Sequence, residues 1–213
     1  MTSFDATPAA KAATSAMPPR LLVLRHGRSV ANEQGLIASS LGNAEQDFGL
    51  TDQGRAQVFA SVGASCAWIV VPVTVVSSPL LRARETADVA AEILDTDVRV
   101  DHRLIERSFG ELELDCDDRY EAVWTLDRRD PTHRTWNVES VVEVWDRLQH
   151  LLKALLDDPG IRAAPESSVL LVTHGDVASI LICGSKGKPL SRHRDVGAMG
   201  TGELRAVDWP PVS

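Results

Sequence analysis

Short runs of mainly apolar residues recur along the chain, at residues 21–24, 73–76 and 169–172. A run of this length, bounded by polar residues, is typical of a strand that is buried on both faces of a sheet. Residues 202–208, near the end of the chain, predict a further strand at the edge of the same sheet. These strands are far apart in the sequence, so other elements must connect them.

Longer segments between the runs predict helices over residues 52–67, 80–94 and 139–156, and a short helix that ends near residue 182. Thr51 is a good N-cap for the first helix, because its hydroxyl oxygen can accept a hydrogen bond from a free backbone N–H. Strand and helix thus alternate, which predicts an α/β fold. The expected architecture is a three-layer sandwich, in which helices flank a mostly parallel central sheet.

Two stretches lack this regular pattern. Residues 1–19 are rich in Ala, Thr, Ser and Pro and predict a flexible leader, followed by a single domain over residues 20–213. Residues 101–131 are polar and aromatic, with weak periodicity. We expect this second stretch to form a partly helical excursion over the active site.

Composition and charge narrow the range of partners. The chain has 213 residues, 44% of them hydrophobic, and a net charge of -8. This negative balance argues against a nucleic-acid surface and against attraction to anionic lipid. No apolar run approaches the ~20 residues of a membrane span, so we expect no membrane partner. An anionic substrate must then be held by a few arginines focused in one pocket.

The cysteines and the leader indicate a reducing, cytoplasmic location. Cys66, Cys116 and Cys183 are scattered, and none belongs to a Cys-x-x-Cys pair. We therefore expect small core residues rather than disulfides or a zinc site. The leader has no apolar stretch of the kind found in a signal peptide.

Two of the predicted strands end in the same pair of residues, His-Gly. His26 follows the first strand and His174 follows the third, so both are expected at the carboxyl edge of the sheet, where ligands bind in α/β folds. One neutral imidazole is able to act as a nucleophile while the other stabilises charge. Arg25 and Arg82, beside the strand ends, are forked donors suited to a phosphoryl group.

Around these histidines the chain resembles the histidine phosphatase superfamily, in its phosphoglycerate mutase-like branch 1. The first motif has the family's pattern of Arg-His-Gly followed by Ser and then Asn, from Arg25 to Asn32. Further segments agree in the family's order, which makes the resemblance far more specific than one short motif. The matching segments are residues 24–32, 50–57, 77–87, 104–110, 139–147 and 172–175.

The resemblance implies roles for individual residues. His26 would be the nucleophile that becomes phosphorylated, and Glu106 the proton donor to the leaving oxygen and then the base that activates water. The groups implied to surround the phosphoryl group are Arg25, Asn32, Arg82, His174 and the backbone of Gly175. The chemistry implied is metal-independent and needs no cofactor, since arginine and histidine stabilise the charge.

Each assignment has a plainer alternative. His174 can be a satisfied structural histidine, Arg82 a solvated helix residue, and Asn32 a turn or cap residue. Glu111 and Glu113 lie near Glu106 and compete with it for the role of the acid. A zinc ligand role for His26 is disfavoured, because further ligands at fixed spacing are missing. The other histidines, which have no supporting motif, are expected on the surface: His102, His133, His150 and His193.

The sequence departs from the family pattern at positions that bear on the substrate. Arg28 stands where an acidic or amide residue is more usual, and it either favours a substrate with a second anionic group or points to solvent. The loop 36–48 is longer than usual. Val138 replaces a glycine, and Thr201 stands where Asn is frequent.

The leading hypothesis is a phosphomonoester hydrolase that acts on a small phosphorylated metabolite. A phosphoglycerate mutase uses the same site, but Phe109 replaces the usual tyrosine and the region after Glu106 is brief, which favours the hydrolase. A non-catalytic phospholigand-binding scaffold would be expected to have lost a catalytic residue, and none is missing. The sequence leaves open whether the protein forms a homodimer.

Overall fold

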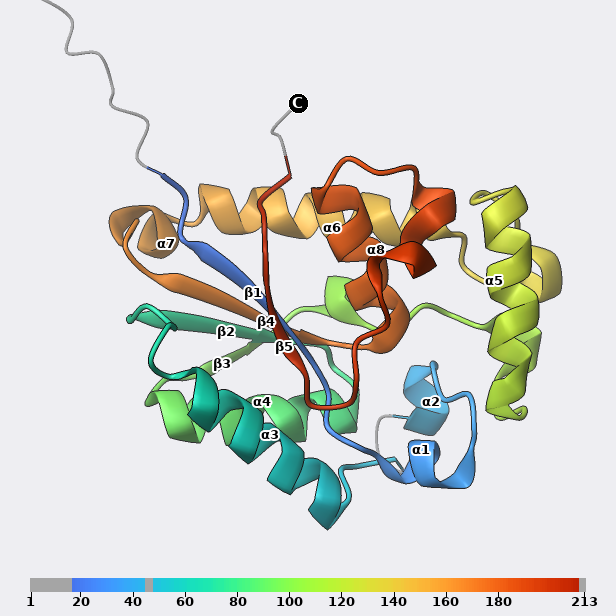
Figure 1. Cartoon of the computed structure of the whole chain (residues 1–213), viewed down its shortest axis with the longest axis horizontal. Helices are drawn as coiled ribbons and strands as arrows, with labels where there is room; N and C mark the ends of the chain where they lie inside the picture. Colours follow the sequence, from blue (N-terminus) through green and yellow to red (C-terminus); the bar gives the residue numbers. More distant parts are fainter. Residues whose placement is uncertain (1–16, 45–47, 211–213) are drawn as a thin grey trace, which may run out of the picture.

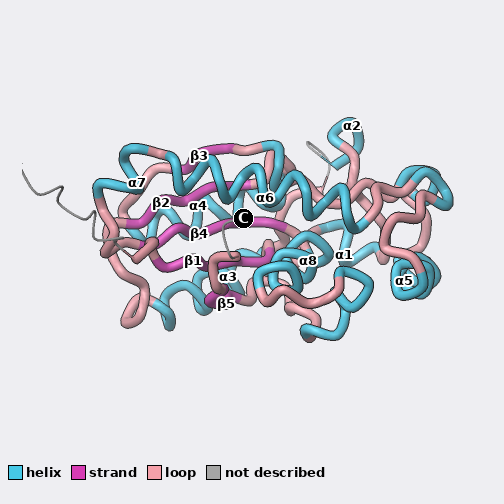
Figure 2. Tube along the Cα trace, turned by 90° about the horizontal axis from the view of Figure 1, so that it is seen from above, coloured by secondary structure: helices cyan, strands magenta, loops and turns pink. Residues whose placement is uncertain are grey.

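The structure is a computed structural model that describes residues 17–44 and 48–210 (Figure 1). Its centre is a sheet in the order β3-β2-β4-β1-β5, in which β5 is antiparallel to β1 and the other pairings are parallel. Figure 2 shows the strands side by side in this order. The strands are β1 (Arg20–Arg25), β2 (Val73–Ser77), β3 (Val98–Val100), β4 (Ser168–Thr173) and β5 (Leu204–Val207).

Helices cover both faces of the sheet, which confirms the predicted layered α/β architecture. In Figure 1, α3 and α4 lie below the sheet and α6 and α8 lie above it, while α5 stands apart at the right. No helix within residues 17–44 and 48–210 is long and apolar enough to cross a membrane. The helices are α1 (Val30–Gln34), α2 (Leu41–Ala44), α3 (Asp52–Ser65), α4 (Leu81–Leu94), α5 (Tyr120–Arg129), α6 (Val141–Asp157), α7 (Pro159–Ala163) and α8 (Gly175–Ser185).

The middle residues of β1 and β4 are all apolar because these strands are buried on both faces. In β1, Leu21 and Val23 belong to the core under α6 and α8, while Leu22 and Leu24 belong to the core against α3 and α4. β4 alternates in the same way between the two cores. Side chains of successive strand residues point to opposite faces, so a continuous apolar run is what a central strand requires.

The long predicted elements are found within about two residues of their expected bounds. Thr51 caps α3 by accepting a hydrogen bond from the backbone N–H of Gly54. The helix expected from residue 139 begins at Val141, because Ser140 forms a capping box with Glu143. The predicted edge strand and the partly helical excursion are both present, as β5 and as the short turns and α5. β3, α1, α2 and α7 are too short to show in the sequence pattern.

Four predictions about single residues are wrong, and the predicted leader lies outside the description. Cys66 and Cys116 are exposed rather than in the core, since each stands beyond the end of an element on the solvent side. His193 is fully buried and the side chain of His133 is only 8% exposed, so neither lies on the surface. Both imidazoles face the buried carboxylate of Asp127, with Nε2 3.8 Å away for His193 and 2.8 Å for His133. The predicted leader falls almost entirely on residues 1–16, which lie outside the described residues.

The contact between α6 and α8 generates a test of the packing. An added Cβ at Gly184 in α8 would overlap the ring of Trp145 in α6. We expect Gly184→Ala to lower the free energy of unfolding by about 1–3 kcal/mol, because overpacking forces neighbours off their rotamers. Urea unfolding measures this change.

The matched control is Gly63→Ala in α3, where an added Cβ meets nothing within 4 Å. At this exposed helical site alanine should raise the free energy of unfolding by about 0.5–1 kcal/mol. Equal effects of the two substitutions would contradict the packing described here.

Candidate active site

A pocket of about 190 Å³ opens at the carboxyl edge of the sheet. The pairing of Arg25 in β1 with Thr173 in β4 places the residues that follow these strands next to one another. The backbone N–H of His26 donates to the carbonyl oxygen of Thr173 across this edge, at 2.9 Å. Six of the predicted site residues line the pocket: Arg25, His26, Asn32, Arg82, Glu106 and Gly175.

His26 is buried, and its two ring nitrogens have different partners. Nδ1 lies 2.8 Å from the carbonyl oxygen of Gly27, and Nε2 accepts a hydrogen bond from Nε of Arg82 at 3.1 Å. A carbonyl oxygen can only accept, so the proton belongs on Nδ1 and Nε2 keeps its lone pair. Burial, and then the charges of Arg82 and Arg25, hold the pKa of His26 well below its usual value. The imidazole is therefore neutral, with an unprotonated Nε2 at the pocket.

His174 lies behind His26 and does not itself line the pocket. The two ring centroids are 5.2 Å apart, and Nε2 of His174 is 2.7 Å from the hydroxyl oxygen of Ser78, the residue after β2. Burial, and then the charge of Arg82, lowers the pKa of His174 well below its usual value. The predicted meeting of the two histidines is thus present, and His174 is also a hydrogen-bonded buried residue.

Buried Arg82 and partly buried Arg25 face the pocket with donors to spare. Arg82 donates from Nη2 to the carbonyl oxygen of Ala38 at 2.8 Å, and Arg25 from Nη1 to that of Met199 at 2.6 Å. Nη1 of Arg82 and Nε of Arg25 are buried without a hydrogen-bond partner among the described residues. Burial lowers the pKa of both groups, but guanidinium stays charged in proteins. Such donors suit the oxygens of a phosphoryl group.

Gly175 allows the close approach of one of these arginines. An added Cβ at this position would lie 3.4 Å from Cζ of Arg25, in tight contact with the guanidinium. Gly175 is also the first residue of α8, so its backbone stands at the positive end of a helix. Both features favour an anion at this point of the pocket.

Glu106 is buried at the pocket wall. Its Oε1 accepts a hydrogen bond from the backbone N–H of Arg107 at 2.9 Å. Burial, and then the nearby carboxylate of Asp176, raises the pKa of Glu106 to about 7. The competing acids are engaged elsewhere, since Glu113 accepts hydrogen bonds from the backbone of Ser39 and Glu111 from Asn137. Glu106 is therefore poised to carry a proton near neutral pH.

Asn32 is a cap residue that also stands at the pocket. Its Oδ1 accepts hydrogen bonds from the backbone N–H and the hydroxyl of Ser29, at 3.1 and 3.0 Å, and this closes a capping box on α1. The residue also lines the pocket. Because its oxygen is engaged, the amide NH₂ is the part that remains to donate to a ligand.

Several pocket residues were not assigned to the site from the sequence, although Trp124 was weighed as a pocket residue against core or lid packing. Asp176, Tyr120, Trp124 and Arg194 line the pocket together with Glu106. Asp176 directly follows the second His-Gly pair, so its position in the motif was a usable signal. Tyr120 and Trp124 are four residues apart in α5 and share one face, a spacing that is visible once the helix is known.

The family departures are explained by local contacts. Arg28 does not line the pocket, and its exposed side chain lies 3.5 Å from Glu33. Val138 packs with Phe109 in a small separate core. Thr201 donates its hydroxyl to Gln57 at 3.0 Å. The described part of the chain holds no cluster of three or more His, Cys, Asp or Glu side chains suited to a metal ion.

Comparisons with known proteins identify the family. Residues 21–211 match the model of the histidine phosphatase superfamily (branch 1). Glucosyl-3-phosphoglycerate phosphatase of Mycolicibacterium vanbaalenii is 32% identical over 191 residues, which cover 85% of this chain and 80% of that protein. A probable phosphoglycerate mutase of Cronobacter sakazakii is 31% identical over 180 residues, which cover 82% and 78% of the two chains.

A solved structure has the same fold over nearly its whole length. The mycobacterial glucosyl-3-phosphoglycerate phosphatase in complex with VO3 superposes with a TM-score of 0.73 at 27% identity, over 91% of this chain and 99% of that chain. Since the family model spans both strands that end in His-Gly and all the segments around the pocket, the chain belongs to the histidine phosphatase superfamily, branch 1.

Proposed function

We propose that the protein is a phosphomonoester hydrolase whose substrate is a small phosphorylated sugar, and that the reaction passes through a phosphohistidine on His26. The observation that carries the proposal is the unprotonated Nε2 of His26 beside the unpaired donor of buried Arg82. A nucleophile and a fixed positive charge at one point are the minimum that transfer of a phosphoryl group requires.

The first step forms the phosphoenzyme. Nε2 of His26 gives up its hydrogen bond from Nε of Arg82 and donates its lone pair to phosphorus, while the bond from phosphorus to the ester oxygen breaks. Glu106, protonated near neutral pH because its pKa is about 7, gives its proton to the leaving oxygen. The carbonyl oxygen of Gly27 keeps the proton on Nδ1 and so orients the ring throughout.

The second step releases phosphate. Glu106, now a carboxylate, takes a proton from a water molecule, whose oxygen attacks phosphorus as the bond to Nε2 breaks. Both the acid and the base form of Glu106 are accessible at neutral pH, as this exchange of roles needs. The enzyme returns to its starting state with a neutral His26.

The groups around His26 stabilise the charge on the transferred phosphoryl group. Arg25 and Arg82 offer two positive charges and unpaired N–H donors inside the pocket. Asn32 offers its amide, and His174 backs the nucleophile at 5.2 Å. Donors held in place before the reaction lower the barrier without reorganising during it.

The substrate class rests on the relatives. Glucosyl-3-phosphoglycerate phosphatases match this chain in sequence and in fold, which supports a phosphorylated sugar derivative as substrate. Isomerisation of phosphoglycerate is the second candidate, favoured by the likeness to a probable phosphoglycerate mutase.

A metal-free assay over phosphorylated sugars and phosphoglycerates tests the function directly. We expect phosphate release, and we expect His26→Ala to abolish both turnover and phosphoenzyme formation. His150→Ala, an exposed histidine of α6, is the matched control and should keep full activity. Isomerised product that depends on 2,3-bisphosphoglycerate, without phosphate release, would instead establish the mutase.

Glu106→Gln tests the proton donor. A glutamine cannot protonate the leaving oxygen, so we expect kcat/KM, which reports the step that expels the leaving group, to fall roughly 10²-fold for alkyl phosphates and much less for p-nitrophenyl phosphate. In the parent enzyme, kcat/KM for alkyl phosphates should fall as pH rises through about 7, because the raised pKa keeps Glu106 protonated only below that value. Stopped assays over a pH series measure both effects.

The control for this variant is Glu111→Gln, because the side chain of Glu111 accepts a hydrogen bond from Asn137 instead. It should leave the pH profile unchanged. Equal losses of Glu106→Gln on good and poor leaving groups would rule out the role of the acid.

Arg82→Ala tests charge stabilisation. Loss of a preorganised donor to the phosphoryl group is expected to lower kcat by roughly 10²-fold or more. Arg84→Ala, two residues further along α4, is the control and should stay within about 2-fold, because the side chain of Arg84 does not line the pocket. A loss shared by both variants would point to the helix rather than to the pocket.

A further inference from the structure

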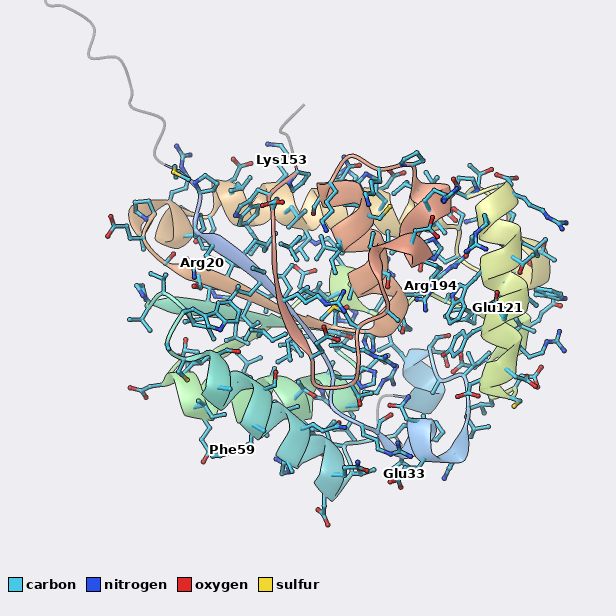
Figure 3. The ribbon with its side chains drawn as sticks, in the orientation of Figure 1. Arg20, Glu33, Phe59, Glu121, Lys153 and Arg194 are labelled. Atoms are coloured by element: carbon cyan, nitrogen blue, oxygen red, sulfur yellow. The ribbon has the colours of Figure 1, made fainter. Side chains whose placement is uncertain are left out.

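Arg194 is a third arginine at the pocket, and the proposed chemistry does not use it. It belongs to the 3₁₀ segment Leu190–Val196 that follows α8, and it lines the pocket beside Asp176. Figure 3 shows Arg194 on this segment, on the side that faces α5. Its side chain is 19% exposed, so it is neither a core residue nor a free surface arginine.

The guanidinium of Arg194 is held in a fixed orientation by aromatic stacking. Its Cζ lies 3.7 Å above the ring of Trp124. Tyr120 stacks on the same indole, with the two ring planes at 6° and their centroids 5.4 Å apart. The indole Nε1 is in turn hydrogen-bonded to Asp176 at 3.0 Å. With these contacts, Trp124 acts as a support for the arginine.

One side of the guanidinium is anchored and the other is free. Nη1 donates to Asp176 at 3.1 Å and to the hydroxyl of Ser179 at 3.4 Å. No hydrogen bond joins Nε or Nη2 of Arg194 to any residue within 17–44 and 48–210. These two nitrogens form one fork of the guanidinium, the arrangement that binds a carboxylate with two parallel hydrogen bonds.

The charges around Arg194 favour a group with a single negative charge. Arg194 and buried Arg107 face two carboxylates, Asp127 and Asp176, so this set is balanced. Arg25 and Arg82 remain to neutralise a dianionic phosphoryl group at His26. A second dianion near Arg194 would add two charges to this balanced set, whereas a carboxylate on the leaving group adds only one.

We propose that Arg194 binds a carboxylate of the leaving group. It would thereby select phosphate esters whose alcohol part carries a carboxylate over esters whose alcohol part is uncharged. The proposal rests on the proposed function and deepens it. The sequence leaves open whether Arg28 favours a second anionic group or points to solvent. The side chain of Arg28 lies outside the pocket, and Arg194 takes its place as the candidate for that group.

The test compares two esters that differ at one group. In 3-phosphoglycerate a carboxylate stands where glycerol 3-phosphate has a hydroxymethyl group. We expect the parent enzyme to prefer 3-phosphoglycerate in kcat/KM, and Arg194→Met to lower this preference by roughly 10- to 100-fold, the usual effect of losing hydrogen bonds to a charged group. Arg28→Met is the control and should leave the preference unchanged.

A second readout does not depend on turnover. In the His26→Ala background, calorimetry should show tighter binding of 3-phosphoglycerate than of glycerol 3-phosphate, and Arg194→Met should remove the difference. Arg194→Lys, which keeps the charge but not the fork, should restore it only in part. The proposal is overturned if Arg194→Met weakens the binding of both esters equally, or weakens the binding of neither. Failure of hydrolysis alone, with the binding difference intact, would count against the proposed function instead.

Discussion

The parallel pairing of β1 with β4 is the contact on which the site depends. It sets Arg25 opposite Thr173 and so brings His26 and His174, which are 148 positions apart, to a ring separation of 5.2 Å. The pairing is fixed because both strands are buried on both faces, and a shift of one residue would turn every apolar side chain to the wrong core. The two cores therefore hold the histidines together.

Burial acts in opposite directions on the two groups that the proposed reaction needs. Desolvation disfavours the charged form of any side chain, so it lowers the pKa of His26 and raises that of Glu106 to about 7. The same pocket thus supplies an unprotonated nitrogen and a protonated carboxyl group. The neighbouring arginines push His26 in the same direction and oppose the shift of Glu106, which keeps the acid close to neutral pH.

The sequence predicts the parts of this molecule that rest on long, regular patterns. The apolar runs, the helix caps and the family motifs account for the layers and for the residues around His26. The wall formed by Asp176, Trp124 and Arg194 was missed because it assembles from α8, α5 and a 3₁₀ segment that have no shared sequence pattern. Arg107 shows the same limit, since only the fold reveals its buried pairing with Asp127, at 2.7 Å.

This buried ion pair also explains why paired charges lie on one side of the pocket and unpaired donors on the other. A buried arginine needs a carboxylate within hydrogen-bond distance, and Arg107 has two, Asp127 and Asp176. Asp176 in turn accepts hydrogen bonds from Arg194 and from the indole of Trp124, which fix the positions of both side chains. The ion pairs are thus satisfied on one side of the pocket, while Arg25 and Arg82 keep unpaired donors on the other. A substrate that carries a dianion at one end and a weaker anion at the other fits that division of charge.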